Sequence, residues 1–260
     1  MSSLQILFED GRAYERYMGV WSQSVGNAFL NWLACKPGQR WLDVGCGNGA
    51  FTELVAQRCA PAQLTGIDPS EAQLRHARMR PACRSARFEP GGALSLPFAD
   101  AAFDVAVMPL VIFFVPDPGA GVAEMKRVVG SGGIVSAYSW DMLGGGFPYA
   151  ALHEEMEGMG VEVPRPPSPE ASQMETSSEL WSAAGLSNIE TKIISVQRTY
   201  ASFDEYWQIV QDGPSAGRQI AAMSAADQQR LKARLRARLE SAAGGAITCS
   251  ARANAIKGHV

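Results

Sequence analysis

The chain has 260 residues, a formal net charge of −3, and a composition of 47% hydrophobic and 19% charged residues. This length suits one elaborated domain over residues 1–260, and the small negative charge offers no general attraction to nucleic acid, so we expect no nucleic-acid partner. The five cysteines form no C-x-x-C pair, which argues against a disulfide framework and a structural zinc site. No metal is therefore expected.

The N-terminal residues lack the basic segment and long apolar core of a signal peptide. No uncharged apolar run approaches the roughly 18 residues that a membrane span requires. Together with the cysteine usage, these features predict a cytoplasmic protein without a membrane span.

Short apolar runs and helical stretches alternate from residue 40 onward. The pattern predicts strands at 40–45, 63–68, 86–91, 103–110 and 132–140, and helices at 50–59, 70–79 and 119–129. This alternation is typical of the doubly wound α/β class, with a parallel sheet covered by helices on both faces. Ligands of such sheets bind beyond the carboxyl ends of the strands.

The alternation changes after residue 140, where glycine- and proline-rich segments surround helical ones. We expect two cap insertions over the strand ends, with the last two strands of the sheet beside them. The insertions are expected at 141–180 and 200–244, and the strands at 186–198 and 246–257. Residues 1–38 would form an N-terminal helical lid next to a core at 40–140.

The stretch WLDVGCGNGAF, residues 41–51, places three glycines directly after a buried strand. Their spacing fits the dinucleotide fingerprint, and Asp68 lies 19 residues beyond Gly49, where an acid that binds ribose is expected. Asp43, two positions before Gly45, would repel a pyrophosphate but suits an ammonium or sulfonium group. The loop therefore favours S-adenosylmethionine over NAD.

Several motifs of the chain resemble those of class I S-adenosylmethionine-dependent methyltransferases. LDVGCGNGAF resembles the first motif of that family, and GIDPSEAQLRHAR its second strand and helix. LSLPFADAAFDVAV and EMKRVVGSGG resemble the small-molecule branch that includes the ubiquinone and menaquinone biosynthesis methyltransferases. The resemblance implies a Rossmann-like methyltransferase fold with a mostly parallel seven-stranded sheet, S-adenosylmethionine as cofactor, and methyl transfer to a small-molecule acceptor.

The resemblance also implies a role for individual residues. Asp43 would engage the amino end of the methionine moiety, and Asp68 would bind the ribose hydroxyls. The remaining expected cofactor residues are Gly45, Cys46, Gly47 and Gly49 in the loop, Pro69 and Gln73 beside the adenosine, Met108 and Pro109 with Leu110 along the methyl path, and Tyr17 and Trp21 in the lid. Relatives often carry an aspartate near the adenine amine where this chain has Gly92, so backbone groups of Gly92, Ala93 and Leu94 are expected to meet the adenine.

The sequence does not assign a catalytic residue. His153 is the one histidine placed to act as a general base, and the cap tyrosines Tyr149, Tyr200 and Tyr206 cannot be assigned from spacing. A catalytically silent S-adenosylmethionine-binding or partner-binding protein, an RNA methyltransferase and, last, an NAD-linked oxidoreductase remain as alternatives. The acceptor atom and the oligomeric state are not determined by the sequence.

Overall fold

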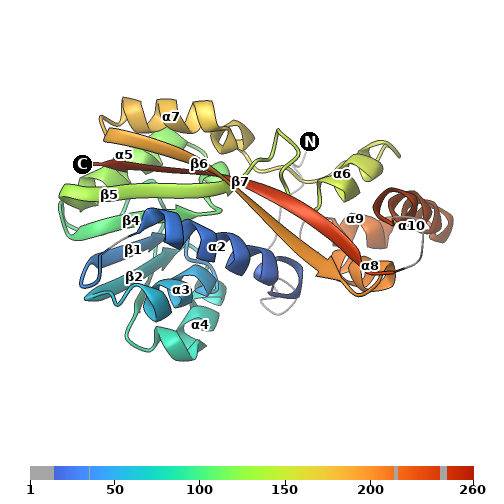
Figure 1. Cartoon of the computed structure of the whole chain (residues 1–260), viewed down its shortest axis with the longest axis horizontal. Coiled ribbons are helices and arrows are strands. Elements are labelled where there is room, and N and C mark those ends of the chain that lie inside the picture. Colours follow the sequence, from blue (N-terminus) through green and yellow to red (C-terminus); the bar gives the residue numbers. More distant parts are fainter. Residues whose placement is uncertain (1–14, 35, 214–215, 241–244) are drawn as a thin grey trace.

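The computed structural model describes residues 15–34, 36–213, 216–240 and 245–260. Within them, seven strands form one sheet in the order β3-β2-β1-β4-β5-β7-β6 (Figure 1). The strands are β1 (Arg40–Val44), β2 (Gln63–Asp68), β3 (Arg87–Pro90), β4 (Phe103–Pro109), β5 (Val129–Trp140), β6 (Ser187–Tyr200) and β7 (Ile247–His259). All pairs are parallel except those of β7, which runs antiparallel to both β5 and β6. The predicted fold class is confirmed.

The described chain has helices on both faces of this sheet and further helices beyond its end. They are α2 (Val20–Leu33), α3 (Ala50–Arg58), α4 (Glu71–Met79), α5 (Pro118–Val128), α6 (Ala150–Glu157), α7 (Met174–Ala183), α8 (Phe203–Gln211), α9 (Gly217–Ala222) and α10 (Ala225–Leu239). Four short helical turns add to them, η1 (Glu15–Gly19), η2 (Pro81–Cys83), η3 (Ile112–Phe114) and η4 (Pro169–Ser172). Figure 1 shows α5 and α7 on one side of the sheet and α2 and α3 on the other.

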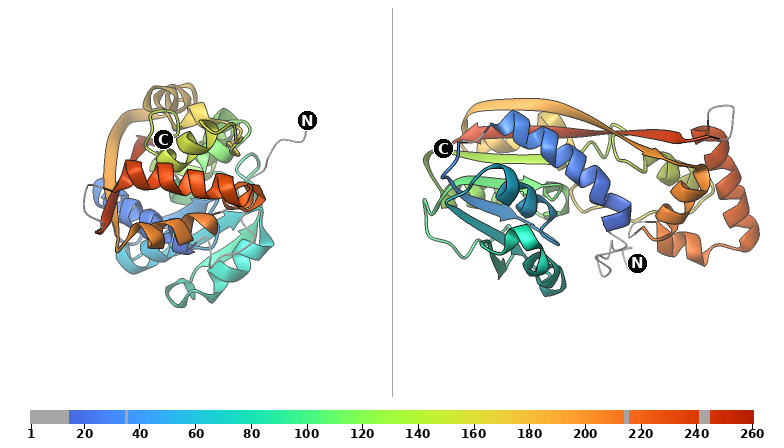
Figure 2. Two further views of the ribbon diagram at one scale, coloured as in Figure 1. Left: turned by 90° about the vertical axis from the view of Figure 1, so that its right-hand side faces the viewer. Right: turned by 60° about the horizontal axis from the view of Figure 1, so that its bottom comes forward.

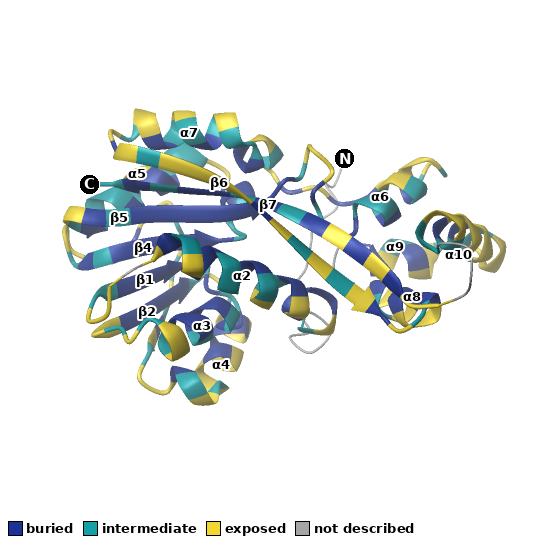
Figure 3. Ribbon diagram, in the orientation of Figure 1, coloured by how far each residue is buried: buried dark blue, intermediate teal, exposed yellow. Residues whose placement is uncertain are grey.

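The central strand β4 shows why the sheet needs both layers. Val105 and Val107 pack into the core shared with α2 and α3, whereas Ala106 and Met108 pack into the core shared with α5 and α7. All four side chains are fully buried, as the continuous blue of the central strands shows in Figure 3. An apolar run without alternation is typical of a parallel strand covered on both faces, so the layers follow from the sequence of the strand.

The last two strands extend well beyond the rest of the sheet. β5 pairs with β7 only as far as Trp140 and Ala253, while β6 and β7 continue to pair from there to Tyr200 and Ile247. Helices α8, α9 and α10 lie at the far end of this ribbon, and α6 packs against α10 (Figures 1 and 2). We call the extended β6–β7 ribbon with α6, α8, α9 and α10 the arm.

Ion pairs hold the helices of the arm together. On α10, Arg234 and Arg238 contact Glu155 of α6, at 2.6 and 3.4 Å, and Arg236 contacts Asp204 of α8 at 3.0 Å. Leu231 of the same helix is fully buried. The basic run of α10 therefore pairs with acids of its own chain, as expected for an amphipathic helix with charged flanks.

Helix α7 belongs to the sheet layers although it begins within residues 141–180, where a cap insertion is expected. It packs against α5, β6 and β7. The indole Nε1 of its buried Trp181 donates a hydrogen bond to the carbonyl of Val135 on β5, at 3.0 Å. Of the N-terminal segment expected as a lid, residues 1–14 lie outside the described residues, so η1 and α2 represent it in the structure.

Candidate active site

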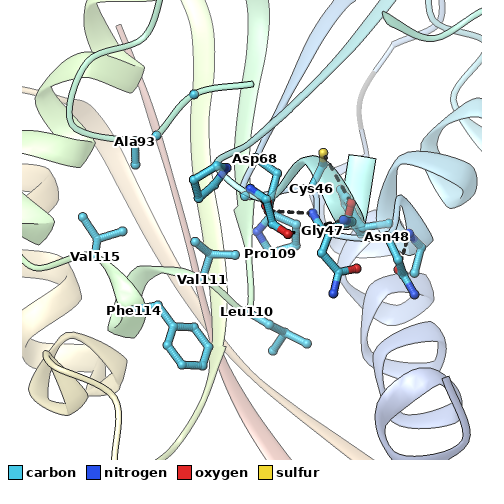
Figure 4. A pocket seen from close by; sticks show the side chains of 18 of the residues that line it. Cys46, Gly47, Asn48, Asp68, Ala93, Pro109, Leu110, Val111, Phe114 and Val115 are labelled. Carbon is cyan, nitrogen blue, oxygen red and sulfur yellow. Dashed lines mark hydrogen bonds between the residues drawn. The ribbon is translucent and has the colours of Figure 1, made fainter. Parts of the chain in front are cut away.

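A cavity of about 620 Å³ lies at the carboxyl ends of β1, β2 and β4 (Figure 4). Its lining residues are Gly19, Ser22, Gly45, Cys46, Gly47, Asn48, Ala50, Phe51, Asp68, Pro69, Ser70, Gln73, Gly91, Gly92, Ala93, Leu94, Ser95, Pro109, Leu110, Val111, Phe114, Val115, Pro116 and Tyr138. This edge of a doubly wound sheet is where its ligands bind. The volume lies in the range of small-molecule and cofactor sites.

The glycine loop after β1 forms one side of the cavity. Backbone amides of Gly45 and Cys46 donate to the carbonyl of Ile67, at 2.8 and 3.0 Å, which ties the loop to the end of β2. Gly45 and Gly47 have φ values of +74° and +52°, a conformation that favours glycine. A Cβ on Gly45 would lie 2.6 Å from Val111, whereas one on Gly47 would meet no atom of the described residues within 4 Å. Gly47 thus presents bare backbone to open space.

Asp68 ends β2 beside this loop. Its Oδ2 accepts a hydrogen bond from the amide of Gly47 at 2.9 Å, and its Oδ1 accepts one from the amide of Ser70 at 2.8 Å. Burial raises the pKa of Asp68, and these two backbone hydrogen bonds oppose that rise. Each carboxylate oxygen keeps a further acceptor site, so Asp68 can order the loop and still bind hydroxyls from the cavity.

Asp43 lies below the glycine loop and does not line the cavity. It is fully buried, its Oδ2 accepts a hydrogen bond from the hydroxyl of Thr52 at 2.6 Å, and its Oδ1 has no partner among the described residues. Burial is the largest cause that raises the pKa of Asp43 to about 7, and the hydrogen bond from Thr52 acts in the opposite direction. A buried carboxylate with an unpaired oxygen would gain from a cation bound above it.

The structure brings most of the expected cofactor residues to the cavity. Besides the loop and Asp68, these are Pro69, Gln73, Gly92, Ala93, Leu94 and Pro109. Gly49 and Met108 lie elsewhere, because the Cα hydrogens of Gly49 face Ala77 of α4 and Met108 is buried in the core under α5. Tyr17 and Trp21 are also buried in the protein core.

The N-terminal segment does reach the cavity, but through other residues than Tyr17 and Trp21. Gly19 and Ser22, their neighbours in the chain, line it instead, as does Tyr138 at the end of β5. Sequence reasoning passed over these three residues. The position of Tyr138 near the carboxyl end of a predicted strand was the available signal, whereas Gly19 and Ser22 carried none.

The opposite wall is apolar and comes from the segment after β4. Figure 4 shows Phe114 and Val115 across the cavity from Asp68, with Val111 between them and the glycine loop. Leu110 adopts a φ of +60°, which costs a branched residue about 1–2 kcal/mol. Such strain is found where function requires a particular side-chain direction, and the Leu110 side chain lines the cavity.

The proline-rich stretch from residue 161 to 172 supports this wall from behind. Ser168 donates its amide to the carbonyl of Phe113 at 3.0 Å and its hydroxyl to the carbonyl of Val115 at 2.8 Å. The stretch therefore has contacts with the backbone of the cavity wall.

His153 does not line the cavity. It lies on α6 in the arm, with its ring centroid 5.0 Å from that of Phe147. Burial lowers its pKa to about 4, so His153 is neutral at pH 7 and a weak base. Tyr149 is also in the arm, where its hydroxyl donates to the carbonyl of Tyr17 at 2.5 Å and burial raises its pKa.

The donor set of the cavity suits a nucleoside that carries a positive charge. Asp68 is the one charged side chain among the described lining residues, and the buried carboxyl of Asp43 lies under the loop. Gly47 allows close approach to the backbone. No group of three or more acidic, histidine or cysteine side chains in the described part of the chain could hold a metal ion, and none of its helices is long and apolar enough to cross a membrane.

Comparison with known proteins relates this chain to methyltransferases. Residues 42–137 match the methyltransferase domain family. The chain is 38% identical over 108 residues to a demethylmenaquinone methyltransferase of Desulfitobacterium hafniense, a match that covers 40% of this chain and 43% of that protein. It is 32% identical over 113 residues to a malonyl-acyl-carrier-protein O-methyltransferase of Serratia marcescens, covering 44% and 43% of the two chains. The matched stretch thus spans less than half of either relative.

A solved structure extends the comparison to most of the chain. Phosphoethanolamine N-methyltransferase 2 of Haemonchus contortus, in complex with S-adenosyl-L-methionine, superposes with a TM-score of 0.59 at 20% identity, over 95% of this chain and 56% of that one. At this identity the likeness shows the fold. Residues 42–137 therefore match the methyltransferase domain family, within a chain that has the fold of S-adenosylmethionine-dependent methyltransferases.

Proposed function

We propose that the protein transfers a methyl group from S-adenosylmethionine to a small, largely apolar acceptor. One observation carries the proposal: the open backbone of Gly47 and the carboxylate of Asp68 lie on one side of a cavity whose other wall is apolar. The first side suits a polar nucleoside, and the second suits an organic acceptor. The methyltransferase domain supports the reaction class.

Five residues would hold the cofactor in complementary ways. Asp68 would accept hydrogen bonds from the two ribose hydroxyls, and Gly47 would allow the methionine part to approach the loop. A bound ammonium group would favour the ionised form of Asp43, whose carboxylate would then stabilise it from below. The backbone of Gly92 and Ala93 would meet the adenine edge, because a Cβ on Gly92 would find open space.

S-adenosylmethionine supplies, when bound, a methyl group on a sulfonium centre that is already activated for displacement. The protein then has to align the acceptor with that methyl group and exclude water. Leu110, Val111 and Phe114 provide an apolar wall for both tasks. Gly19 and Ser22 of the N-terminal segment complete the cavity beside the loop, and we propose that this segment covers the bound cofactor.

The described part of the cavity offers no ready general base. Burial strongly raises the pKa of Cys46, and Asp68 already accepts two backbone hydrogen bonds. The acceptor would therefore supply its own nucleophile, either a neutral amine or a group that ionises near neutral pH. Of the two relatives described above, one is named for demethylmenaquinone and the other for a malonyl group on an acyl-carrier protein. The first name supports a small-molecule substrate for this chain.

Calorimetric titration tests the proposal. Wild type is titrated with S-adenosylmethionine, S-adenosylhomocysteine and NAD, as are Asp68→Asn and the control Asp104→Asn. Asp104 pairs with Arg40 at the opposite end of the sheet, at 2.7 Å, so the same substitution there should leave ligand affinity unchanged. We expect binding of the two adenosyl ligands in the micromolar range, weakened by Asp68→Asn alone.

Acceptor turnover then separates the remaining classes. Formation of S-adenosylhomocysteine with a panel of neutral phenols and amines supports the proposal, while turnover with RNA alone would replace it with RNA methylation. Binding without turnover of any acceptor would favour a catalytically silent protein. Binding of NAD without either adenosyl ligand would refute the assignment.

A further inference from the structure

Arg80, at the end of α4, lies between the glycine loop and the N-terminal segment, outside the cavity. Its guanidinium donates three hydrogen bonds to three different parts of the chain. Nε donates to the carbonyl of Asn48 in the loop at 2.6 Å, Nη1 to Glu53 of α3 at 2.7 Å, and Nη2 to Glu15 of η1 at 3.0 Å. Its side chain is 17% exposed, so these bonds lie largely away from solvent.

Asn48 connects this junction to the cavity. It lines the cavity, its Nδ2 donates to the same carboxylate oxygen of Glu15 at 3.2 Å, and its Oδ1 accepts the amide of Ala50 at the start of α3, also at 3.2 Å. Its predecessor in the chain is Gly47, the residue with open space above it. Any displacement of the Asn48 carbonyl therefore moves the backbone that the cofactor would contact.

The loop needs such an anchor because its backbone is otherwise costly to order. Gly45, Gly47 and Gly49 all have positive φ, and glycine loses more conformational freedom on folding than any other residue. Asp68 fixes the amide of Gly47, and Ala77 of α4 leaves no room for a Cβ at Gly49. Arg80 anchors the peptide between them.

We propose that Arg80 is a positioning residue for the cofactor site, which holds the glycine loop in its binding conformation and joins it to η1 through Glu15. Arginine suits this role because its planar fork reaches three acceptors at once, which the single ammonium of lysine cannot do. The inference rests on the proposed function, since it concerns affinity for the same cofactor. It adds a residue with no contact to the cavity.

The test compares Arg80→Gln with Arg58→Gln by calorimetric titration with S-adenosylhomocysteine and by thermal unfolding without ligand. Arg58 is the matched control, because it also donates three hydrogen bonds, to Asn27 and Asn31 of α2, but has no contact with the loop. We expect Arg80→Gln to weaken binding by about tenfold or more, and Arg58→Gln to leave it within about twofold.

Two further variants and one spectrum separate positioning from general stability. Arg80→Lys keeps the charge but lacks the planar fork that reaches three acceptors, so we expect it to restore little of the affinity. Glu15→Gln should cause a smaller loss of affinity, because only one of the three contacts is weakened. Should Arg80→Gln fail to fold, the same prediction is measured on these two variants. In ligand-free protein, the amide resonance of Gly47 should shift in Arg80→Gln and stay in place in Arg58→Gln.

Each failure identifies its own cause. Wild type that binds neither adenosyl ligand refutes the proposed function. Wild type that binds, with Arg80→Gln bound equally well or weakened only as much as Arg58→Gln, refutes the role of Arg80 and leaves the proposed function standing.

Discussion

Replacement of Asp43 by asparagine tests the electrostatics beneath the glycine loop. Burial raises the pKa of Asp43 from an ordinary value of 3.8 to about 7 in the folded protein. Between these two pH values the unfolded chain loses the proton and the folded chain keeps it, so stability falls as pH rises through this window. Asparagine resembles the protonated acid and does not titrate, so the variant lacks this loss.

The size of the effect follows from the two pKa values. Their difference is about 3 pH units, and at about 1.36 kcal/mol per unit the wild type loses roughly 4 kcal/mol between pH 4 and pH 8 relative to Asp43→Asn. The asparagine oxygen can still accept from Thr52, but its amide replaces an oxygen that has no described partner, at a cost of about 1–3 kcal/mol. Ligand-free Asp43→Asn should therefore be less stable than wild type at pH 4 and more stable by about 1–3 kcal/mol at pH 8.

Urea denaturation of the ligand-free proteins at pH 4, 5, 6, 7 and 8 measures this difference. Asp104→Asn is the matched control, because the ion pair with Arg40 lowers the pKa of Asp104 and reverses the expected sign. That pair is about two-fifths exposed, so its loss should cost no more than about 1 kcal/mol at neutral pH, and this cost should shrink toward pH 4. Parallel pH profiles for wild type and Asp43→Asn would show that Asp43 titrates normally and would refute the reasoning.

Three further predictions concern the cavity and the arm. Gly47→Ala should cost about 1 kcal/mol of stability but weaken S-adenosylhomocysteine binding strongly. Gly49→Ala should mainly lower stability, because its Cβ would lie 2.9 Å from Ala77. Thermal unfolding measures the loss of stability, and calorimetric titration measures the loss of affinity. Gly92→Asp should tighten binding by a few fold, because a side chain there has room and a carboxylate can accept from the adenine amine; unchanged affinity in a titration would contradict this. His153→Gln should leave kcat and its pH profile between pH 5 and 8 unchanged, since His153 lies outside the cavity and burial lowers its pKa to about 4. If the variant loses an inflection of the kcat profile in that range, His153 acts as a base and the prediction is wrong.

Most of the cofactor side of the site could be predicted because its signals are local. The glycines of residues 45–49 require positive φ, and Asp68 ends a strand whose apolar pattern is visible in the chain. Once the strands are known, the geometry of a parallel sheet brings their carboxyl ends to one edge. The sequence singles out Asp43 as a cofactor residue, but no pattern indicates that it lies one layer below the cavity.

The remaining features depend on contacts between segments that are distant in the chain. Arg80 meets Glu15 across 65 residues, and Tyr149 meets Tyr17 across 132. The strands β6 and β7 run past β5 and so carry the arm beyond the rest of the sheet. The length of this extension decides whether His153 faces a cavity or a hydrophobic cluster. Periodicity and turn chemistry act over a few residues, so the sequence by itself determined the sheet, the loop and Asp68. Only tertiary packing decided which side chains surround them, because packing depends on the register and length of elements that no local pattern relates to one another.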